Sequence, residues 1–307
     1  MKTYKPNEIK NIALVGSAGS GKTTLAEAMM YEGGVIPRRG SISAKNTSSD
    51  YRPVEQEYGS SVFPAVLYTE WKEHKLNFID TPGADDFVGG VISALNVVDT
   101  GVMVINAVRG IEVGTEIISR HAKRLNKPLI FVINQVDHEK ANFDHTVEQA
   151  KAAFGTKVVL VQYPVNPGIG FNRVIDVLKM EMYQWKPEGG KPDVLPIPKE
   201  EEEKANELHN ALIEAAAEND EGLMELFFDK GSLTEDEMRA GIRKGLIARD
   251  MFPFSACRQK RMCVRRFMEF VINVAPVPVP CHLPLRKTET KFRTTRKADY
   301  LYMFNDS

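Results

Sequence analysis

One octapeptide near the start of the chain constrains the fold more than any other feature. It has the spacing of a phosphate-binding loop: glycine, four residues, then Gly-Lys-Thr. It consists of Gly16, Ser17, Ala18, Gly19, Ser20, Gly21, Lys22 and Thr23. The glycines let backbone N–H groups surround an anion, and a helix starting at Lys22 would point its positive end at the same place. The apolar run 11–15 before it and the helical pattern to about residue 31 favour this site over a turn that only caps a helix.

Apolar strands alternate with amphipathic helices through the first 135 residues. Segment 34–57 is polar and without a clear period, which predicts a long mobile loop. Further strands are expected at 61–71, 75–79, 101–105 and 128–133, and helices near 89–98 and 114–125. This order predicts an α/β fold of the P-loop NTPase type, a mostly parallel sheet with helices on both faces. Ligands of such sheets bind at the carboxyl ends of the strands.

Composition excludes several classes of protein. With 43% hydrophobic and 26% charged residues over 307 positions, the chain differs from disordered sequences. No apolar run approaches the roughly 18 residues of a membrane span, and the first ten residues lack the apolar core of a signal peptide. The three cysteines fit neither a disulfide framework nor a zinc site. We therefore expect a cytoplasmic protein without a membrane partner.

Charge is distributed unevenly although the net charge is only −1. From Ser255 to the end, eleven Lys and Arg residues stand against four Asp and Glu residues. Basic segments of this kind contact nucleic acid in some proteins and are merely solvated in others. Composition alone favours the solvated alternative, and we expect no DNA partner.

The tetrapeptide 80–83, Asp-Thr-Pro-Gly, follows the strand expected at 75–79. The carboxylate of Asp80 could reach a magnesium ion that also binds the Thr23 hydroxyl, and the Gly83 N–H could contact a γ-phosphate. By itself the tetrapeptide is also a good turn. Because it follows a phosphate-binding loop, we interpret it as part of a nucleotide site.

A second tetrapeptide, Asn-Gln-Val-Asp at 134–137, follows the strand expected at 128–133. A carboxylate at Asp137 could accept hydrogen bonds from N1–H and the 2-amino group of guanine, a donor pair that adenine lacks. Asn134 would brace the loop and the base. Taken alone, the tetrapeptide could equally be a strand that ends in an Asx turn.

The second half of the chain is a less regular mixture. We expect a helix near 144–153, a strand at 157–163, a helix near 171–182 and a connector at 189–199 that is rich in Gly and Pro. Charged amphipathic helices are expected at 200–229 and 234–249, a strand at 251–256 and a helix at 264–274. Ser255 and Ala256, at the end of that strand, could supply a backbone N–H to guanine O6. Segment 275–284 predicts an extended linker.

These motifs together predict a GTP-binding domain, and their combination resembles the GTPase domain of bacterial elongation factor G. The likeness is closest to the elongation factor G-like, second-paralogue branch of these translational GTPases. The segments that carry it are NIALVGSAGSGKTTL (11–25), DTPGADDFVG (80–89), IEVGT (111–115), NQVD (134–137), VLVQYP (159–164) and residues 170–180. More than a hundred residues separate Asp137 from Ser255, where elongation factor G carries an inserted subdomain. The resemblance covers residues 9 to 274.

The resemblance implies a domain organisation and a set of partners. A GTP-binding domain would comprise 1–138 and 250–275, and an inserted α+β subdomain would comprise 139–249. Residues 276–307 would form a linker and the first strand of a β-barrel, at 300–304. GTP or GDP with Mg²⁺ would be the bound ligands, and the ribosome the partner. Five basic residues could approach ribosomal RNA phosphates, namely Arg258, Lys260, Arg261, Arg265 and Arg266.

The resemblance also assigns roles. Ser61 occupies the place of the family's threonine that binds magnesium and senses the γ-phosphate, so 34–61 would be the first switch and 80–91 the second. The residues expected to contact nucleotide are Gly16, Ser17, Ala18, Gly19, Ser20, Gly21, Lys22, Thr23, Thr24, Asp80, Asn134, Gln135, Asp137, Ser255 and Ala256. Lys22, Gly83 and Ser61 would act in catalysis, and Thr23, Ser61 and Asp80 would bind magnesium.

Three positions depart from the family pattern. Ala84 replaces the histidine that orients the attacking water, and loss of such a group lowers the rate by roughly 10²–10⁴-fold. Gln135 replaces a lysine whose stem packs along the base, and Gly19 replaces an aspartate beside the phosphates. The sequence therefore supports a translational GTPase with weak hydrolysis. The alternatives are a GTP-binding switch that does not turn over, or a fragment of a ribosomal protection factor.

Overall fold

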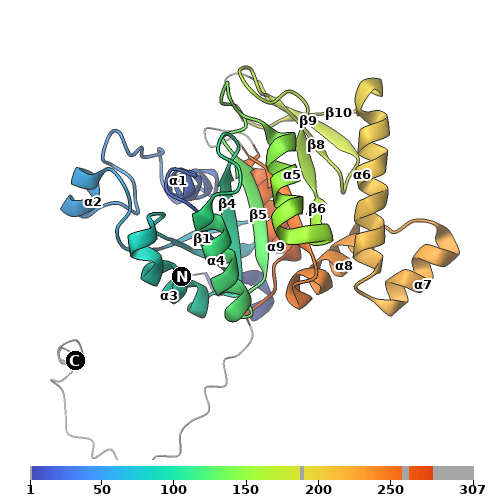
Figure 1. The fold of residues 1–307 in the computed structure, drawn as a ribbon, viewed down its shortest axis with the longest axis horizontal. Coiled ribbons are helices and arrows are strands. Elements are labelled where there is room, and N and C mark those ends of the chain that lie inside the picture. The colour runs from blue at the N-terminus through green and yellow to red at the C-terminus, as the bar shows by residue number, and fades with distance from the viewer. Residues whose placement is uncertain (1, 187–189, 258–262, 279–307) are drawn as a thin grey trace, which may run out of the picture.

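The computed structural model describes residues 2–186, 190–257 and 263–278, which form two β-sheets and the helices around them (Figure 1). The main sheet has the order β2-β3-β1-β4-β5-β11-β6. Its strands are β1 (Ile9–Val15), β2 (Ala65–Trp71), β3 (His74–Asp80), β4 (Thr100–Asn106), β5 (Leu129–Asn134), β6 (Val158–Leu160) and β11 (Phe252–Ala256). Neighbouring strands are parallel except β2, which is antiparallel to β3. The predicted α/β fold is confirmed.

Helices cover both faces of the main sheet. Those nearest to it are α1 (Lys22–Glu32), α3 (Val88–Val97), α4 (Val113–Arg124), α5 (Phe143–Phe154) and α9 (Val264–Val274). Helix α1 packs beside α9, and α3 packs beside α4. Strands β4 and β5 are buried along their whole length, because a parallel sheet covered on both faces leaves no side of these strands in water. None of the described helices combines the length and the apolar character needed to cross a membrane.

The second sheet and three helices form the part of the chain that lies to the right in Figure 1. Its antiparallel strands, in the order β10-β9-β8-β7, are β7 (Gln162–Pro164), β8 (Arg173–Asp176), β9 (Glu181–Gln184) and β10 (Asp193–Leu195). The helices are α6 (Lys199–Ala217), α7 (Glu221–Lys230) and α8 (Glu235–Ala248). Because β6 belongs to the main sheet and β7 to the second, the two sheets part at Val161. The domain boundaries at 139 and 249 stay a prediction.

Two predictions for this part of the chain are wrong. The helix expected near 171–182 is the hairpin β8–β9, because the Asp176 carboxylate accepts hydrogen bonds from the backbone N–H groups of Leu178 and Lys179 and so turns the chain. The single helix expected at 200–229 is two helices. The first, α6, ends at Ala217, and Asp220 then caps α7 by accepting a hydrogen bond from the Leu223 N–H.

The segment predicted as a long loop contains a helix, α2 (Pro53–Tyr58). Pro53 is well placed at its first turn, where no N–H is needed. Buried carboxylates hold the segment at both ends: Glu27 of α1 accepts from Gly40 N, and Glu55 of α2 accepts from Val62 N and Phe63 N. Segment 34–61, predicted to be the first switch, is therefore held by buried carboxylates, although most of its residues are exposed or half-buried.

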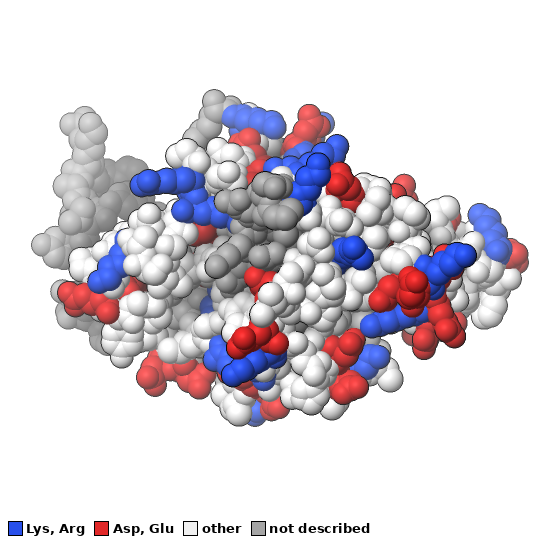
Figure 2. Space-filling model, turned by 90° about the horizontal axis from the view of Figure 1, so that it is seen from above, with Lys and Arg blue, Asp and Glu red and all other residues white. Residues whose placement is uncertain are grey.

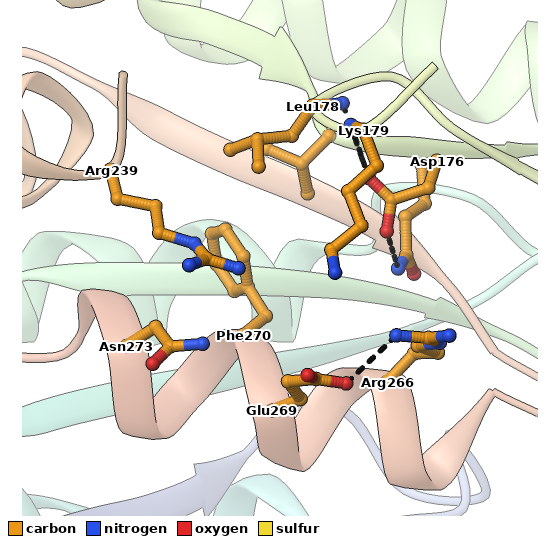
Figure 3. A pocket seen from close by; sticks show the side chains of 10 residues that line it. Asp176, Leu178, Lys179, Arg239, Arg266, Glu269, Phe270 and Asn273 are labelled. Carbon is orange, nitrogen blue, oxygen red and sulfur yellow. Dashed lines mark hydrogen bonds and ion pairs between the residues drawn. The ribbon is translucent and has the colours of Figure 1, made fainter. Parts of the chain in front are cut away.

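A charged seam joins the second sheet to α9 (Figure 3). Asp176 of β8 accepts a hydrogen bond from the side chain of Gln162 at 3.3 Å, and Arg266 of α9 pairs with Glu269 at 2.9 Å. Arg266 also lies over the Tyr183 ring of β9, 3.8 Å from its centroid. Of these contacts, the one between Arg266 and the Tyr183 ring crosses from α9 to the second sheet.

Basic side chains predicted to approach RNA are partly engaged within the chain. Arg265 pairs with Glu32 of α1, and Arg266 belongs to the seam. Arg258, Lys260 and Arg261 lie outside the described residues, as does the linker and strand predicted at 276–307 from residue 279 onward. Figure 2 shows Lys and Arg mixed with Asp and Glu over the visible face rather than gathered in one block.

Candidate functional site

The phosphate-binding loop lies between β1 and α1, at the carboxyl end of the main sheet. Gly16 has φ 142°, and a Cβ there would lie 2.3 Å from the Val104 carbonyl oxygen of β4, so no larger residue fits. Gly21, with φ 94°, caps α1 in the left-handed region. Ser17 and Ser20 are buried, Ala18 and Gly19 are exposed, and Thr24 follows in the first turn of α1. The loop has the compact backbone that its sequence predicts.

Lys22 is buried inside this loop, with 6% of its surface exposed. Its ammonium group donates to the carbonyl oxygens of Gly16 at 2.8 Å and Ser17 at 3.0 Å. Burial lowers the pKa of Lys22 to about 8, although the nearby Asp80 works against this shift. A buried cation held only by carbonyl oxygens would gain much from a phosphate anion.

The residues predicted for the base contact the same loop from the other side. The Asn134 amide donates to the Ser20 carbonyl oxygen at 2.9 Å and so contacts the phosphate-binding loop. Its predicted contact with the base stays a prediction. Gln135 has φ 61° and donates from Nε2 to the Gly19 carbonyl oxygen at 3.1 Å. Its side chain therefore lies against the phosphate loop. Asp137, half-buried, follows in the same loop.

Ser255 and Ala256 are the last two residues of β11, beside Val132 and Ile133 of β5. The Ser255 hydroxyl donates to Gln162 Oε1 at 2.7 Å, so it faces the second sheet. Only backbone groups of this pair remain for a base, as the sequence suggests. Most of the following loop, 258–262, lies outside the described residues.

The three residues predicted to bind magnesium come together. Thr23 Oγ1 and Ser61 Oγ are 3.1 Å apart, although 38 positions separate them in the chain. Asp80, at the end of β3, is 1% exposed, and neither of its carboxylate oxygens has a hydrogen-bond partner. Burial raises the pKa of Asp80 to about 6, although the neighbouring Thr23 hydroxyl and Lys22 oppose this. A buried carboxylate without donors is where a cation would be bound.

The structure adds two residues that the sequence did not single out. Asp50 and Ser49 of the first switch are buried, and both Asp50 carboxylate oxygens and the Ser49 hydroxyl lack partners. Burial raises the pKa of Asp50, with the Ser61 hydroxyl opposing. Only the polar run 47–50 inside an unpatterned segment could have signalled them. Since hard cations prefer oxygen ligands, this donor set fits Mg²⁺.

This donor set is poor in carboxylates. Among the described residues, no group of three or more His, Cys, Asp or Glu side chains could hold a metal. Mg²⁺ in nucleotide sites uses one or two carboxylates and takes its remaining ligands from phosphate and water.

Segment 80–91, predicted to be the second switch, approaches the phosphate-binding loop at Gly83. A Cβ at this position would lie 2.4 Å from Lys22 Nζ and 2.8 Å from the Ala18 nitrogen, so only glycine allows the approach. The next residue, Ala84, lies in a groove whose wall includes Ser17, Ala18 and Arg109. Its methyl group offers neither a donor nor an acceptor to a water molecule there.

Comparison with known proteins agrees with this geometry. Residues 7–277 match the family described as the elongation factor Tu GTP binding domain. The chain is also similar to a crystal structure of a protein from Thermus thermophilus, with a TM-score of 0.82 and 28% sequence identity. The similarity covers 89% of this chain and 41% of the other, so the chain spans less than half the length of that protein.

Proposed function

The chain belongs to the elongation factor Tu GTP binding domain family, whose members are translational GTPases, and from this membership we propose that it binds GTP with Mg²⁺ and acts on the ribosome in the cytoplasm. Within the family we assign it to the elongation factor G-like, second-paralogue branch. The motifs at 80–89, 111–115 and 134–137 support this assignment. In this setting, GTP would drive a switch between binding and release during elongation and translocation.

One observation carries the proposal: a set of buried polar atoms without partners surrounds Lys22. It includes both carboxylate oxygens of Asp80 and of Asp50. Unsatisfied buried carboxylates destabilise a fold unless a ligand binds them, since each lost partner costs about 1–3 kcal/mol. Mg²⁺ and a nucleotide triphosphate have the charges and oxygens that this site lacks.

Each residue then has a defined task. Lys22 and the N–H groups of the loop hold the β- and γ-phosphates, and Gly83 offers its N–H to the γ-phosphate. Thr23, Ser61 and Asp80 hold the magnesium ion, which neutralises phosphate charge when bound. Asp137 selects guanine, Asn134 braces the loop, and the backbone at Ser255 and Ala256 faces guanine O6.

Hydrolysis is expected to be weak because of Ala84. A methyl group cannot orient the attacking water, and the loss of such a group lowers the rate by roughly 10²–10⁴-fold. The same residue favours the second candidate function, a GTP-gated binding module that does not turn over. Release of phosphate in the presence of ribosomes separates the two.

The test begins with binding of a fluorescent GTP analogue with and without Mg²⁺. We expect Asp137→Asn to transfer preference from GTP to xanthosine triphosphate, because an amide donates where the carboxylate accepts. Glu139→Gln, at an exposed position of the same loop, serves as the matched control. An unchanged preference in Asp137→Asn would disprove the guanine assignment. Phosphate release with purified ribosomes then measures turnover.

A further inference from the structure

An arginine outside the predicted site lies on the phosphate-binding loop. Arg109 follows β4 in a tight turn in which Arg109 N donates to the Asn106 carbonyl oxygen at 3.1 Å. Its guanidinium group donates to the Ala18 carbonyl oxygen. The other terminal nitrogen pairs with Glu112 at 3.2 Å, and 41% of the side chain is exposed. The loop and the turn are 91 residues apart in sequence, so the fold brings this cation to the site.

Ala18 is also where the second switch meets the loop. Gly83 approaches so closely that a Cβ there would lie 2.8 Å from the Ala18 nitrogen and 2.4 Å from Lys22 Nζ. Arg109, Ala18, Gly83 and Ala84 all line one groove. Arg109 also contributes to the lowered pKa of Lys22, because two cations lie near one another there. The guanidinium is therefore at the end of the loop predicted to hold the γ-phosphate.

Residue 19 is a glycine and lies next to the Arg109 guanidinium. A Cβ at Gly19 would lie 3.0 Å from the Arg109 guanidinium, so a longer side chain would push it aside. A carboxylate at that position would instead pair with the guanidinium and keep it from an incoming phosphate. Gly19 thus leaves room for the Arg109 guanidinium, and Ala84 adds no donor or acceptor to the groove that Arg109 also lines.

We propose that Arg109 is a catalytic residue of this GTPase, an arginine supplied by the chain itself that contacts the γ-phosphate and the β–γ bridging oxygen. The inference rests on the proposed GTP binding. A small change in side-chain rotamer exchanges the Ala18 carbonyl oxygen for phosphate oxygens, which are better acceptors because they carry charge. The planar fork of arginine matches two phosphate oxygens at once.

In the reaction, the oxygen of a water molecule forms a bond to the γ-phosphorus. The bond between that phosphorus and the β–γ bridging oxygen breaks, and its electron pair stays on GDP. The proton of the water passes to the released phosphate. Arg109 stays protonated throughout and stabilises the negative charge that develops on the bridging oxygen. Arginines in this role raise kcat by about 10³–10⁵-fold, and the partial exposure of Arg109 places it at the lower end.

The test compares wild type with Arg109→Ala and Arg109→Lys, using Arg120→Ala as the control. Arg120 lies on α4 with 72% of its side chain exposed and pairs only with Glu116 at 3.6 Å in the structure. Three readouts are needed: the dissociation constants of fluorescent GDP and GTP, single-turnover hydrolysis of GTP, and formation of the complex of GDP with aluminium fluoride. The aluminium fluoride complex mimics the transferring phosphoryl group and reports binding rather than turnover. No ribosomes are added, because the arginine is supplied in cis.

We expect wild type and Arg120→Ala to form the aluminium fluoride complex. In Arg109→Ala the complex is lost and single-turnover hydrolysis falls by about 10³-fold, while GDP affinity changes less than threefold. Arg109→Lys keeps the positive charge but lacks the planar guanidinium, so its hydrolysis rate should lie between those of wild type and Arg109→Ala. Equal losses of GDP affinity, GTP affinity and turnover would reduce Arg109 to a brace for the loop and overturn the inference. So would a wild type that binds GTP but forms no such complex, whereas a wild type that fails to bind GTP overturns the proposed function itself.

Discussion

Two buried carboxylates in this molecule have opposite surroundings. Asp80, at the candidate site, is 1% exposed, and Asp176, at the seam between the sheets, is 7% exposed. Asp176 accepts hydrogen bonds from Gln162 Nε2, Leu178 N and Lys179 N. Asp80 accepts none. Burial raises the pKa of both groups. The Gln162 side chain and the Lys179 N–H oppose this shift at Asp176, and the Thr23 hydroxyl and Lys22 oppose it at Asp80.

The difference separates a structural group from a binding group. At the seam, the fold itself satisfies the charge, so Asp176 stabilises the folded chain. At the site, the Asp80 carboxylate lacks hydrogen-bond partners, which lowers the stability of the folded chain. A bound cation would remove this cost. Substitutions at the two positions should therefore change stability in opposite directions.

The largest expected effect is on ligand binding by Asp80→Asn. Without the carboxylate, Mg²⁺-dependent affinity for GTP should fall by a hundredfold or more, since truncating one partner of a buried charge pair costs about 2–5 kcal/mol. The nucleotide-free protein should instead gain about 1–3 kcal/mol, because a buried charge without donors is removed. Titration with fluorescent GTP and thermal unfolding measure both. Asp86→Asn, at an exposed position of the same segment, is the control. If nucleotide-free Asp80→Asn were less stable than wild type, the contrast between Asp80 and Asp176 would be wrong.

Next in size is the loss of stability in Asp176→Asn. Its new NH₂ group would face the Gln162 donor, and a buried donor without a partner costs about 1–3 kcal/mol. The unfolding midpoint should fall while affinity for GTP changes less than threefold. A variant that loses GTP binding at unchanged stability would show that the seam belongs to the functional site.

A smaller effect is expected from pH. The pKa of Asp80 is raised to about 6, above its unfolded value of 3.8, so the folded apo protein binds the extra proton. Its contribution to stability is present below pH 4 and is lost as pH rises through about 6. Magnesium-dependent binding runs the other way, because the ion must displace that proton, so affinity should fall as pH drops below about 6. Unfolding and GTP binding measured from pH 5 to 8 test both trends. We expect neither pH dependence in Asp80→Asn.

The smallest effect should come from Ser255→Ala. It removes the hydroxyl that donates to Gln162, and one buried hydrogen bond contributes about 0.5–1.5 kcal/mol. Because Ser255 would contact guanine through its backbone only, GTP affinity should stay within threefold of wild type. Gln162→Met removes the other partner and provides a second estimate of the same bond. A clear loss of affinity in Ser255→Ala would mean that the hydroxyl leaves Gln162 when nucleotide binds.

Sequence reasoning succeeded where a local pattern determines the structure. The loop from Gly16 to Thr23 and the strand ends at Asp80 and Asn134 follow from the order of strands and motifs. The meeting of Thr23 with Ser61 was implied by the family resemblance alone. The prediction of a helix near 171–182 failed because the apolar spacing of this hairpin fits a helix equally well. The hydrogen bonds from Leu178 N and Lys179 N to the Asp176 carboxylate turn the chain, and the spacing does not reveal them. Sequence reasoning also missed Asp50 and Arg109, since nothing in a polar segment or a turn tells which charged residue the fold will bury or aim at another loop.

Lys10 links the start of β1 to the end of α9. Its buried ammonium group donates to the Ala275 carbonyl oxygen at 2.5 Å, and the same strand runs on to the phosphate loop at Gly16. Ala275 thus lies at the amino end of β1, whereas the phosphate-binding loop follows the carboxyl end of the same strand. The hydrogen bond from Lys10 therefore ties the end of α9 to the strand that leads into the phosphate-binding loop.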